Sequence, residues 1–187
     1  MADGLFYLDT REPHLVTDLA AVTMTTTAKA LYPAAAFPVL GGQYFNRPGK
    51  AIKIGLWLKF TLGATPGNLS FNVHWGTGAD ANGTLICTAG TPIAATASVT
   101  KCMYAEFKVR CLTTGTAGTL QATGWAIPDQ ALFTTPLTTC PILIPMAGAA
   151  ASASLDLTAA NIVSIQILQS GTAATVQVQS MEVEALN

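Results

Sequence analysis

The sequence predicts an all-β protein: a two-sheet antiparallel β-sandwich, of the jelly-roll type with about eight strands, and an extended N-terminal arm. The strongest observation is residues 50–62, where large apolar side chains take every second position. A period of two places them on one face of a strand, whereas a helix would spread them around its circumference. The apolar positions are Ile52, Ile54, Leu56, Leu58, Phe60 and Leu62.

Two further observations favour this fold class. Short apolar segments recur along the chain and are separated by turns rich in Gly, Pro, Asn and Ser, which is typical of sandwiches and barrels. No segment carries the 3.6-residue period of an amphipathic helix of ordinary length. At 187 residues the chain is expected to form one domain over residues 29–187, preceded by an arm over residues 1–28.

The arm is the most charged part of the chain, and its apolar residues follow no period. We expect a short helical turn over residues 15–21. An extended arm of this kind either orders across a neighbouring subunit or wraps on its own domain, and the sequence leaves both alternatives open.

The first strands are predicted over residues 24–32 and, at a sheet edge, 39–45. The turn residues 46–49 then lead into the strand at 50–62. The next strands are expected at 69–75 and 84–88.

Later segments predict a hairpin and two closing strands. Residues 98–113 and 119–127 flank a Gly-rich turn and are expected to pair with each other. A strand interrupted by Pro141 is predicted at 139–144, and others at 162–169 and 174–186. The apolar phase of the last strand slips near Gln179 and Ser180, which predicts a β-bulge there.

Alternation also assigns side chains to faces. Trp75 falls in phase with Leu69, Phe71 and Val73, so it is predicted to be in the core, and His74 is predicted to be on the solvent side. Trp57 lies between Lys53 and Lys59 on the face away from the core. It is expected either to be covered by other protein or to serve as a binding platform.

Composition points to a surface that contacts other proteins. Charged residues make up only 10% of the chain, against about 25% in a typical soluble domain, and the net charge is −1. A surface of hydroxyls and amides is weakly protected against association. The alternative interpretation is a compact β domain with a Thr-rich surface.

No catalytic or metal-binding motif stands out in the sequence, so we expect no enzyme activity, no metal and no cofactor. Glu106 lies near Lys108 and Arg110, which predicts a solvated ion pair. The four cysteines fit no zinc or redox spacing and are expected to be free thiols. They are Cys87, Cys102, Cys111 and Cys140.

Other partner classes are not expected either. The basic residues form no clustered patch, so direct binding to nucleic acid is not predicted. No apolar run reaches the roughly 18 residues of a membrane span. The first residues lack the pattern of a signal peptide, so we expect assembly in a reducing host cytoplasm.

A short, charge-poor, all-β chain rich in Ala, Thr and Gly and free of catalytic motifs resembles the structural proteins of tailed-bacteriophage virions. It is most similar to jelly-roll capsid decoration, or cement, proteins. The resemblance implies a homo-trimer or homo-dimer seated on the major capsid protein at the virion surface. The alternative is a carbohydrate-binding module of a phage tail or fibre, and a hydrolase with two close carboxylates is a third hypothesis.

The predicted contact residues lie in three places: the arm, the outward face of residues 50–62, and an Ala-rich loop. They are Leu5, Phe6, Tyr7, Lys53, Trp57, Lys59 and Ala149. Replacement of Trp57 is expected to separate an interface from a sugar platform, because aromatic side chains serve in both.

Overall fold

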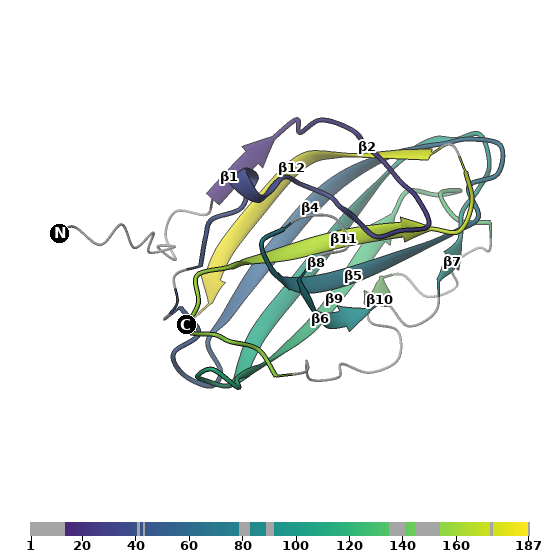
Figure 1. Cartoon of the computed structure of the whole chain (residues 1–187). Helices are drawn as coiled ribbons and strands as arrows, with labels where there is room; N and C mark the ends of the chain where they lie inside the picture. Colours follow the sequence, from purple (N-terminus) through teal and green to yellow (C-terminus); the bar gives the residue numbers. More distant parts are fainter. Residues whose placement is uncertain are drawn as a thin grey trace.

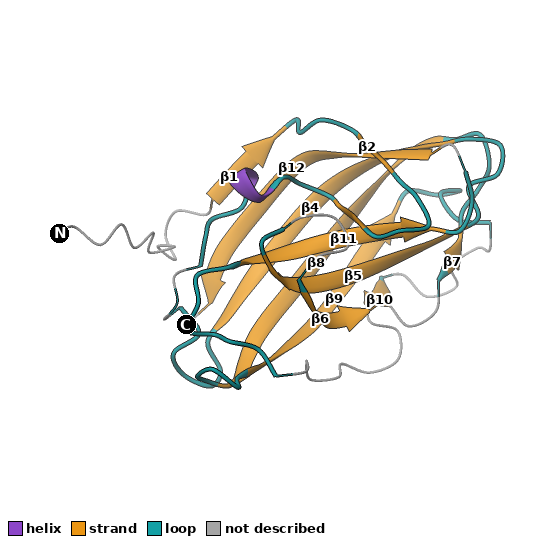
Figure 2. Ribbon diagram, in the orientation of Figure 1, coloured by secondary structure: helices purple, strands orange, loops and turns teal. Residues whose placement is uncertain are grey.

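The computed structural model describes residues 14–40, 42, 44–78, 83–88, 92–134, 141–144, 154–172 and 174–186. Within these residues nearly all regular structure is β, with one 3-10 turn, η1 (Ala34–Ala36). Two antiparallel sheets pack against each other (Figures 1 and 2). The predicted all-β sandwich is therefore confirmed.

We call the larger layer the wide sheet. Its strands follow the order β1-β12-β4-β8-β9-β10, and β2 also pairs with β12. The bounds are β1 (His14–Thr17), β2 (Val22–Thr23), β4 (Ala51–Leu62), β8 (Thr100–Thr113), β9 (Thr119–Pro128), β10 (Ile142–Ile144) and β12 (Ala174–Leu186).

We call the other layer the narrow sheet. Its order is β3-β11-β5-β6, and β7 also pairs with β5. The bounds are β3 (Lys29–Ala30), β5 (Asn68–Gly76), β6 (Thr84–Thr88), β7 (Ile93–Ala94) and β11 (Ile162–Gln169). In the view of Figure 1 the narrow sheet lies in front of the wide sheet, so the outer faces of the two sheets point in opposite directions.

The connectivity is that of a jelly roll. Eight strands form a nested set in which the first pairs with the last: β1 with β12, β3 with β11, β4 with β8, and β5 with β6. The pairs β12–β4 and β11–β5 join the nested pairs into two sheets. A long hairpin rolled in this way places alternate pairs in opposite layers, which is the jelly-roll arrangement. Strands β9 and β10 extend the wide sheet beyond β8.

The core lies between the sheets, as the alternation in residues 50–62 predicts. Ile52, Ile54, Leu56, Leu58 and Phe60 are fully buried, and Leu62 is nearly so. The rings of Phe71 in β5 and Phe107 in β8 meet across the two layers, with centroids 6.1 Å apart. Each large aliphatic side chain buried in this way contributes roughly 1.5–3 kcal/mol to folding. The placement of Trp75 in the core is confirmed.

Most of the predicted strands are confirmed within two residues at each end. This holds for β4, β5, β6, β8, β9, β11 and β12. The predicted hairpin is the β8–β9 pair. The predicted bulge is also present, because the β12–β4 register shifts between Val178 and Ser180. Cys87, Cys102 and Cys111 are free, and Cys140 lies outside the described residues.

Three predictions of local structure are wrong. The strand expected over 24–32 is only the two residues of β3, and the described residues of the edge strand expected at 39–45 form only an isolated bridge between Leu40 and Asn161. The helical turn expected over 15–21 is absent: residues 15–17 belong to strand β1, which pairs with β12, and residues 18–21 have no regular structure. In each case the pairing partner comes from the C-terminal part of the chain, which local sequence does not reveal.

Residues 14–23, within the predicted arm, thus add β1 and β2 to the wide sheet. A buried tyrosine fastens the segment that follows. The Tyr32 hydroxyl donates to the carbonyl of Val163 (2.9 Å) and accepts from the amide of Ile165 (3.1 Å). These bonds satisfy backbone groups of β11 that would otherwise be buried without partners. Burial also raises the pKa of the Tyr32 phenol.

Candidate functional site: an aromatic belt on the wide sheet

The outer face of the wide sheet carries a row of aromatic and large aliphatic side chains. In the strand register Trp57 of β4 lies opposite Tyr104 of β8, which lies opposite Ile127 of β9. In the neighbouring row Trp125 of β9 lies opposite Leu143 of β10. We call these five residues the aromatic belt. They come from four adjacent strands, so the fold brings together positions far apart in the sequence.

Three of the five belt residues are exposed although they are large and hydrophobic, while Tyr104 and Trp125 are partly buried. Trp57, Ile127 and Leu143 are 52%, 47% and 64% exposed, and Leu15 of β1, on the same sheet face, is 64% exposed. Among the described residues only Val39 and Leu85 are comparable exposed large hydrophobic residues elsewhere. A contiguous exposed apolar surface of this kind marks an interaction site in soluble proteins.

The rings of the belt contact one another at an angle. The centroids of Trp57 and Tyr104 are 5.2 Å apart and those of Tyr104 and Trp125 are 5.4 Å apart. The planes are inclined by 51° and 57°. Such tilted pairs are favourable contacts between aromatic rings. They form a ridged surface, which a flat sugar ring cannot cover by stacking on several rings at once.

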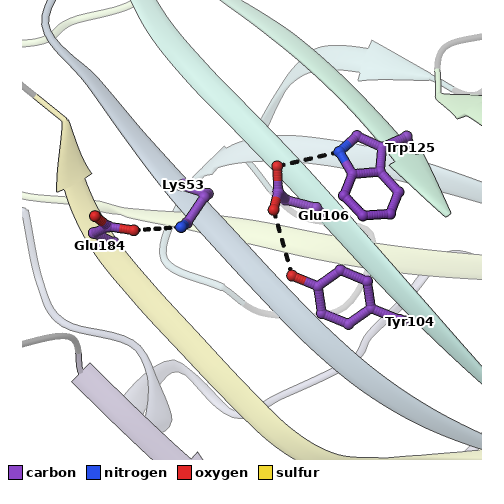
Figure 3. Close-up of polar contacts among 5 residues, drawn as sticks. All are labelled: Lys53, Tyr104, Glu106, Trp125 and Glu184. Atoms are coloured by element: carbon purple, nitrogen blue, oxygen red, sulfur yellow. Dashed lines mark hydrogen bonds and ion pairs between the residues drawn. The ribbon is translucent and has the colours of Figure 1, made fainter.

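A single carboxylate orders two of these rings. Glu106 accepts a hydrogen bond from the Trp125 indole nitrogen (3.1 Å) and one from the Tyr104 hydroxyl (3.4 Å), as Figure 3 shows. Burial and the nearby Glu106 charge raise the pKa of Tyr104. The predicted ion pair of Glu106 with Lys108 or Arg110 is wrong: Arg110 donates to Gln121. Aromatic donors on the same face bind the carboxylate instead.

Glycine at position 55 leaves room for this arrangement. Gly55 lies opposite Glu106 in the register, and a Cβ atom built there would lie 3.0 Å from the Tyr104 hydroxyl oxygen. A larger side chain would therefore displace the Tyr104 ring or its hydrogen bond.

Charged side chains border the belt. Lys53 forms an ion pair with Glu184 of β12 (Figure 3), and the hydrogen bond from this pair raises the pKa of Lys53. Lys101 and Asp129 form a second pair at 3.5 Å. Lys59 lies opposite Gln177 and Cys102 in the register. An apolar centre with a charged rim is the usual anatomy of a protein interface.

A shallow hollow of about 380 Å³ lies beside Trp57. It is bounded by Trp57, Tyr104, Ile127, Cys102, Met103, Pro128 and Asp129. The hollow gives a partner's side chain a place to insert next to the most exposed aromatic ring of the belt.

The predicted contact residues divide into two groups. Trp57, Lys53 and Lys59 lie on the outer face of β4, as the alternation predicts, whereas Leu5, Phe6, Tyr7 and Ala149 lie outside the described residues. The sequence analysis did not identify the other four residues of the belt. Alternation along the predicted hairpin places Tyr104 and Glu106 on its outward face. It does not give the register of the hairpin, which places them opposite Ile127 and Trp125.

His74 is a further correction. It does point to the outer side of the narrow sheet, opposite Ser164, but it is buried rather than solvent-exposed. Its Nδ1 atom lies 3.3 Å from the carbonyl oxygen of Gly83, in the turn before β6. Burial lowers the pKa of His74.

Among the described residues no cluster of three or more His, Cys, Asp and Glu side chains is arranged to hold a metal ion. Those residues also contain no helix with the length and apolar character that crossing a membrane requires. No family model matches the sequence, and no curated protein matches it as a relative.

Proposed function

We propose that this protein is a non-catalytic structural protein of a virion, which binds and stabilises the capsid lattice as a decoration protein. The aromatic belt is the proposed contact surface, and the major capsid protein and further copies of the chain are the proposed partners. The observation that carries the proposal is the exposure of Trp57, Ile127 and Leu143 on one sheet face, where Tyr104 and Trp125 lie between them.

The size of this face supports the proposal. Strands β4, β8 and β12 have 12, 14 and 13 residues, and six strands lie side by side. At about 3.3 Å per residue and 4.8 Å between strands, and with β1, β9 and β10 counted at their own shorter lengths, the face covers roughly 900 Å². A stable interface buries roughly 800 Å² on each partner, so the face is large enough for one.

The chemistry of the belt favours a protein partner over a sugar. Tilted rings with a hollow between them suit side chains that insert, and the belt offers no flat stacking platform. The Glu106 hydrogen bonds hold Tyr104 and Trp125 in place before binding. Preorganisation of this kind lowers the entropy lost on association.

The test is sedimentation of the purified protein, alone and with capsid particles isolated from its source. We expect the wild type to form oligomers or to sediment with the particles. The double substitution Trp57→Ala, Ile127→Ser should weaken this association at least 30-fold, because central interface tryptophans typically contribute about 2 kcal/mol or more.

The matched control is Val39→Ser, because Val39 has the same 52% exposure as Trp57 but lies outside the belt. It should leave association unchanged. A wild-type protein that stays a monomer and never sediments with particles would refute the proposal. If amide spectra show that the wild type and the double variant are both folded, and the two associate equally, the belt is not the contact surface.

A further inference from the structure

The narrow sheet carries a second surface feature that the proposed capsid contact does not use. A groove of about 380 Å³ runs over the outer face of β5, near its pairing with β6 and β11. Its lining residues are Thr26, Asn68, Ser70, Asn72, Thr88, Pro92, Leu168, Gln169 and Ser170. Its volume is within the range of roughly 300–1,000 Å³ that is typical of small-molecule sites.

The alternation of side chains along β5 produces the polar column of the groove. Asn68, Ser70 and Asn72 are successive outward positions of β5, so their side chains form one column. In the register Leu168 lies beside Ser70, and Thr88 lies beside Asn72. The column is therefore flanked by an aliphatic side chain on one strand and a hydroxyl on the other.

Hydrogen bonds hold parts of this surface in place. The Thr88 hydroxyl donates to the Asn72 side-chain oxygen (2.7 Å), which fixes the amide so that its nitrogen remains a donor. The Ser170 hydroxyl accepts from the Asn68 backbone amide (2.8 Å). The lining is thus partly ordered by its own contacts.

The lining selects for an uncharged ligand. None of the described residues that line the groove is charged, so an ionic ligand would lose hydration without gaining a counter-charge. Side-chain amides and hydroxyls both donate and accept hydrogen bonds, which matches the hydroxyls of a sugar. Pro92 and Leu168 provide aliphatic surface for the C–H face of a sugar ring.

We propose that this groove binds a neutral saccharide, on the side of the molecule opposite to the aromatic belt. A protein seated on a lattice through the wide sheet would then present the groove outward. Because the groove is open and its lining includes side-chain amides and hydroxyls, a ligand must displace water that is hydrogen-bonded to them, so we expect weak affinity, of about millimolar Kd.

The experiment uses a panel of neutral oligosaccharides built from glucose, galactose, mannose and N-acetylglucosamine, with sialylated and sulfated versions as charged comparators. Binding is followed by ligand-observed NMR and by amide chemical shifts of the full chain. We expect at least one neutral saccharide to bind and to shift amides at residues 68–72, 88 and 168–170. Its charged versions should bind no better.

Two variants locate the site. Ser70→Leu fills the groove beside Leu168 and should lower the affinity at least tenfold, with the amide spectrum otherwise retained. Trp57→Ala, on the other sheet, is the matched control and should leave saccharide binding unchanged. The proposal is overturned if no neutral saccharide in the panel binds, or if Trp57→Ala abolishes binding and Ser70→Leu does not. Sedimentation with capsid particles should be weakened by Trp57→Ala and unchanged by Ser70→Leu. Each proposal can therefore fail without the other.

Discussion

The two outer faces of the sandwich use the same pleat in different ways. On the wide sheet the outward positions of β4, β8 and β9 include Trp57, Tyr104 and Trp125, which are bordered by ion pairs. On the narrow sheet the outward positions of β5 and β11 are uncharged, and Ser164 and Gln166 are buried. The difference shows that a side chain that points away from the core is not necessarily exposed. Its exposure depends on which segments of the chain pack over that face of the sheet.

One end of the narrow sheet's outer face is covered by the chain itself. A Cβ atom at Gly78 would collide with the Ile162 side chain and lie 3.3 Å from that of Ala34. His74 Nε2 and the Ser164 hydroxyl are buried there without a hydrogen-bond partner. Buried polar atoms of this kind destabilise the folded state, typically by about 1–3 kcal/mol each. In the belt, by contrast, the Tyr104 hydroxyl and the Trp125 indole nitrogen are both hydrogen-bonded to Glu106.

Of the substitutions that distinguish the two faces, Glu106→Ala should have the largest effect on stability. It removes the acceptor of both belt hydrogen bonds, so we expect the free energy of unfolding to fall by about 2 kcal/mol. Urea unfolding measures this change. Loss of the acceptor should also weaken capsid association, because Tyr104 and Trp125 are no longer held in place.

The matched variant for this test is Glu106→Gln, which keeps the shape and one acceptor oxygen. Without the Glu106 charge, the raised pKa of Tyr104 should move back toward its ordinary value, which an absorbance titration of the phenol detects. Unchanged stability in Glu106→Ala would mean that the carboxylate does not order the belt.

On the narrow sheet the expected effect is smaller and opposite in sign. Ser164→Ala deletes a hydroxyl that is 1% exposed and has no hydrogen-bond partner, so the free energy of unfolding should rise by about 1 kcal/mol. Thermal unfolding is a suitable measurement. A clear loss of stability would show that the hydroxyl has a partner in solution, such as a bound water.

The smallest effect should be a pH dependence carried by His74. Its pKa in the folded protein is lowered from the ordinary 6.5 by burial. Below that value the unfolded chain binds a proton that the folded chain resists. The free energy of unfolding should therefore decrease as the pH falls from about 7 to about 5.5.

The control for this prediction is His74→Gln, which cannot titrate. The wild type should lose more stability than this variant over the same pH range, and the difference isolates His74 from the carboxylates and from His14. Parallel pH profiles of the two proteins would contradict the prediction.

Local periodicity predicted the strands and the core face well, because burial on one side imposes a period of two on each long strand. Residues 50–62 and the phase slip near Gln179 are examples. It could not predict the belt, because the meeting of Trp57, Tyr104 and Ile127 depends on register across three strands. It also could not predict the burial of His74, which depends on the turn at Gly83.

The margins of the wide sheet also affect how the molecule assembles. Within the described residues its outermost strands, β1 and β10, are only four and three residues long, whereas the strands between them reach 14. Short edge strands offer few unpaired backbone N–H and C=O groups to which another chain could pair as a new strand. Growth into fibrils by strand addition is therefore disfavoured, and contact between molecules is favoured through the faces of their sheets.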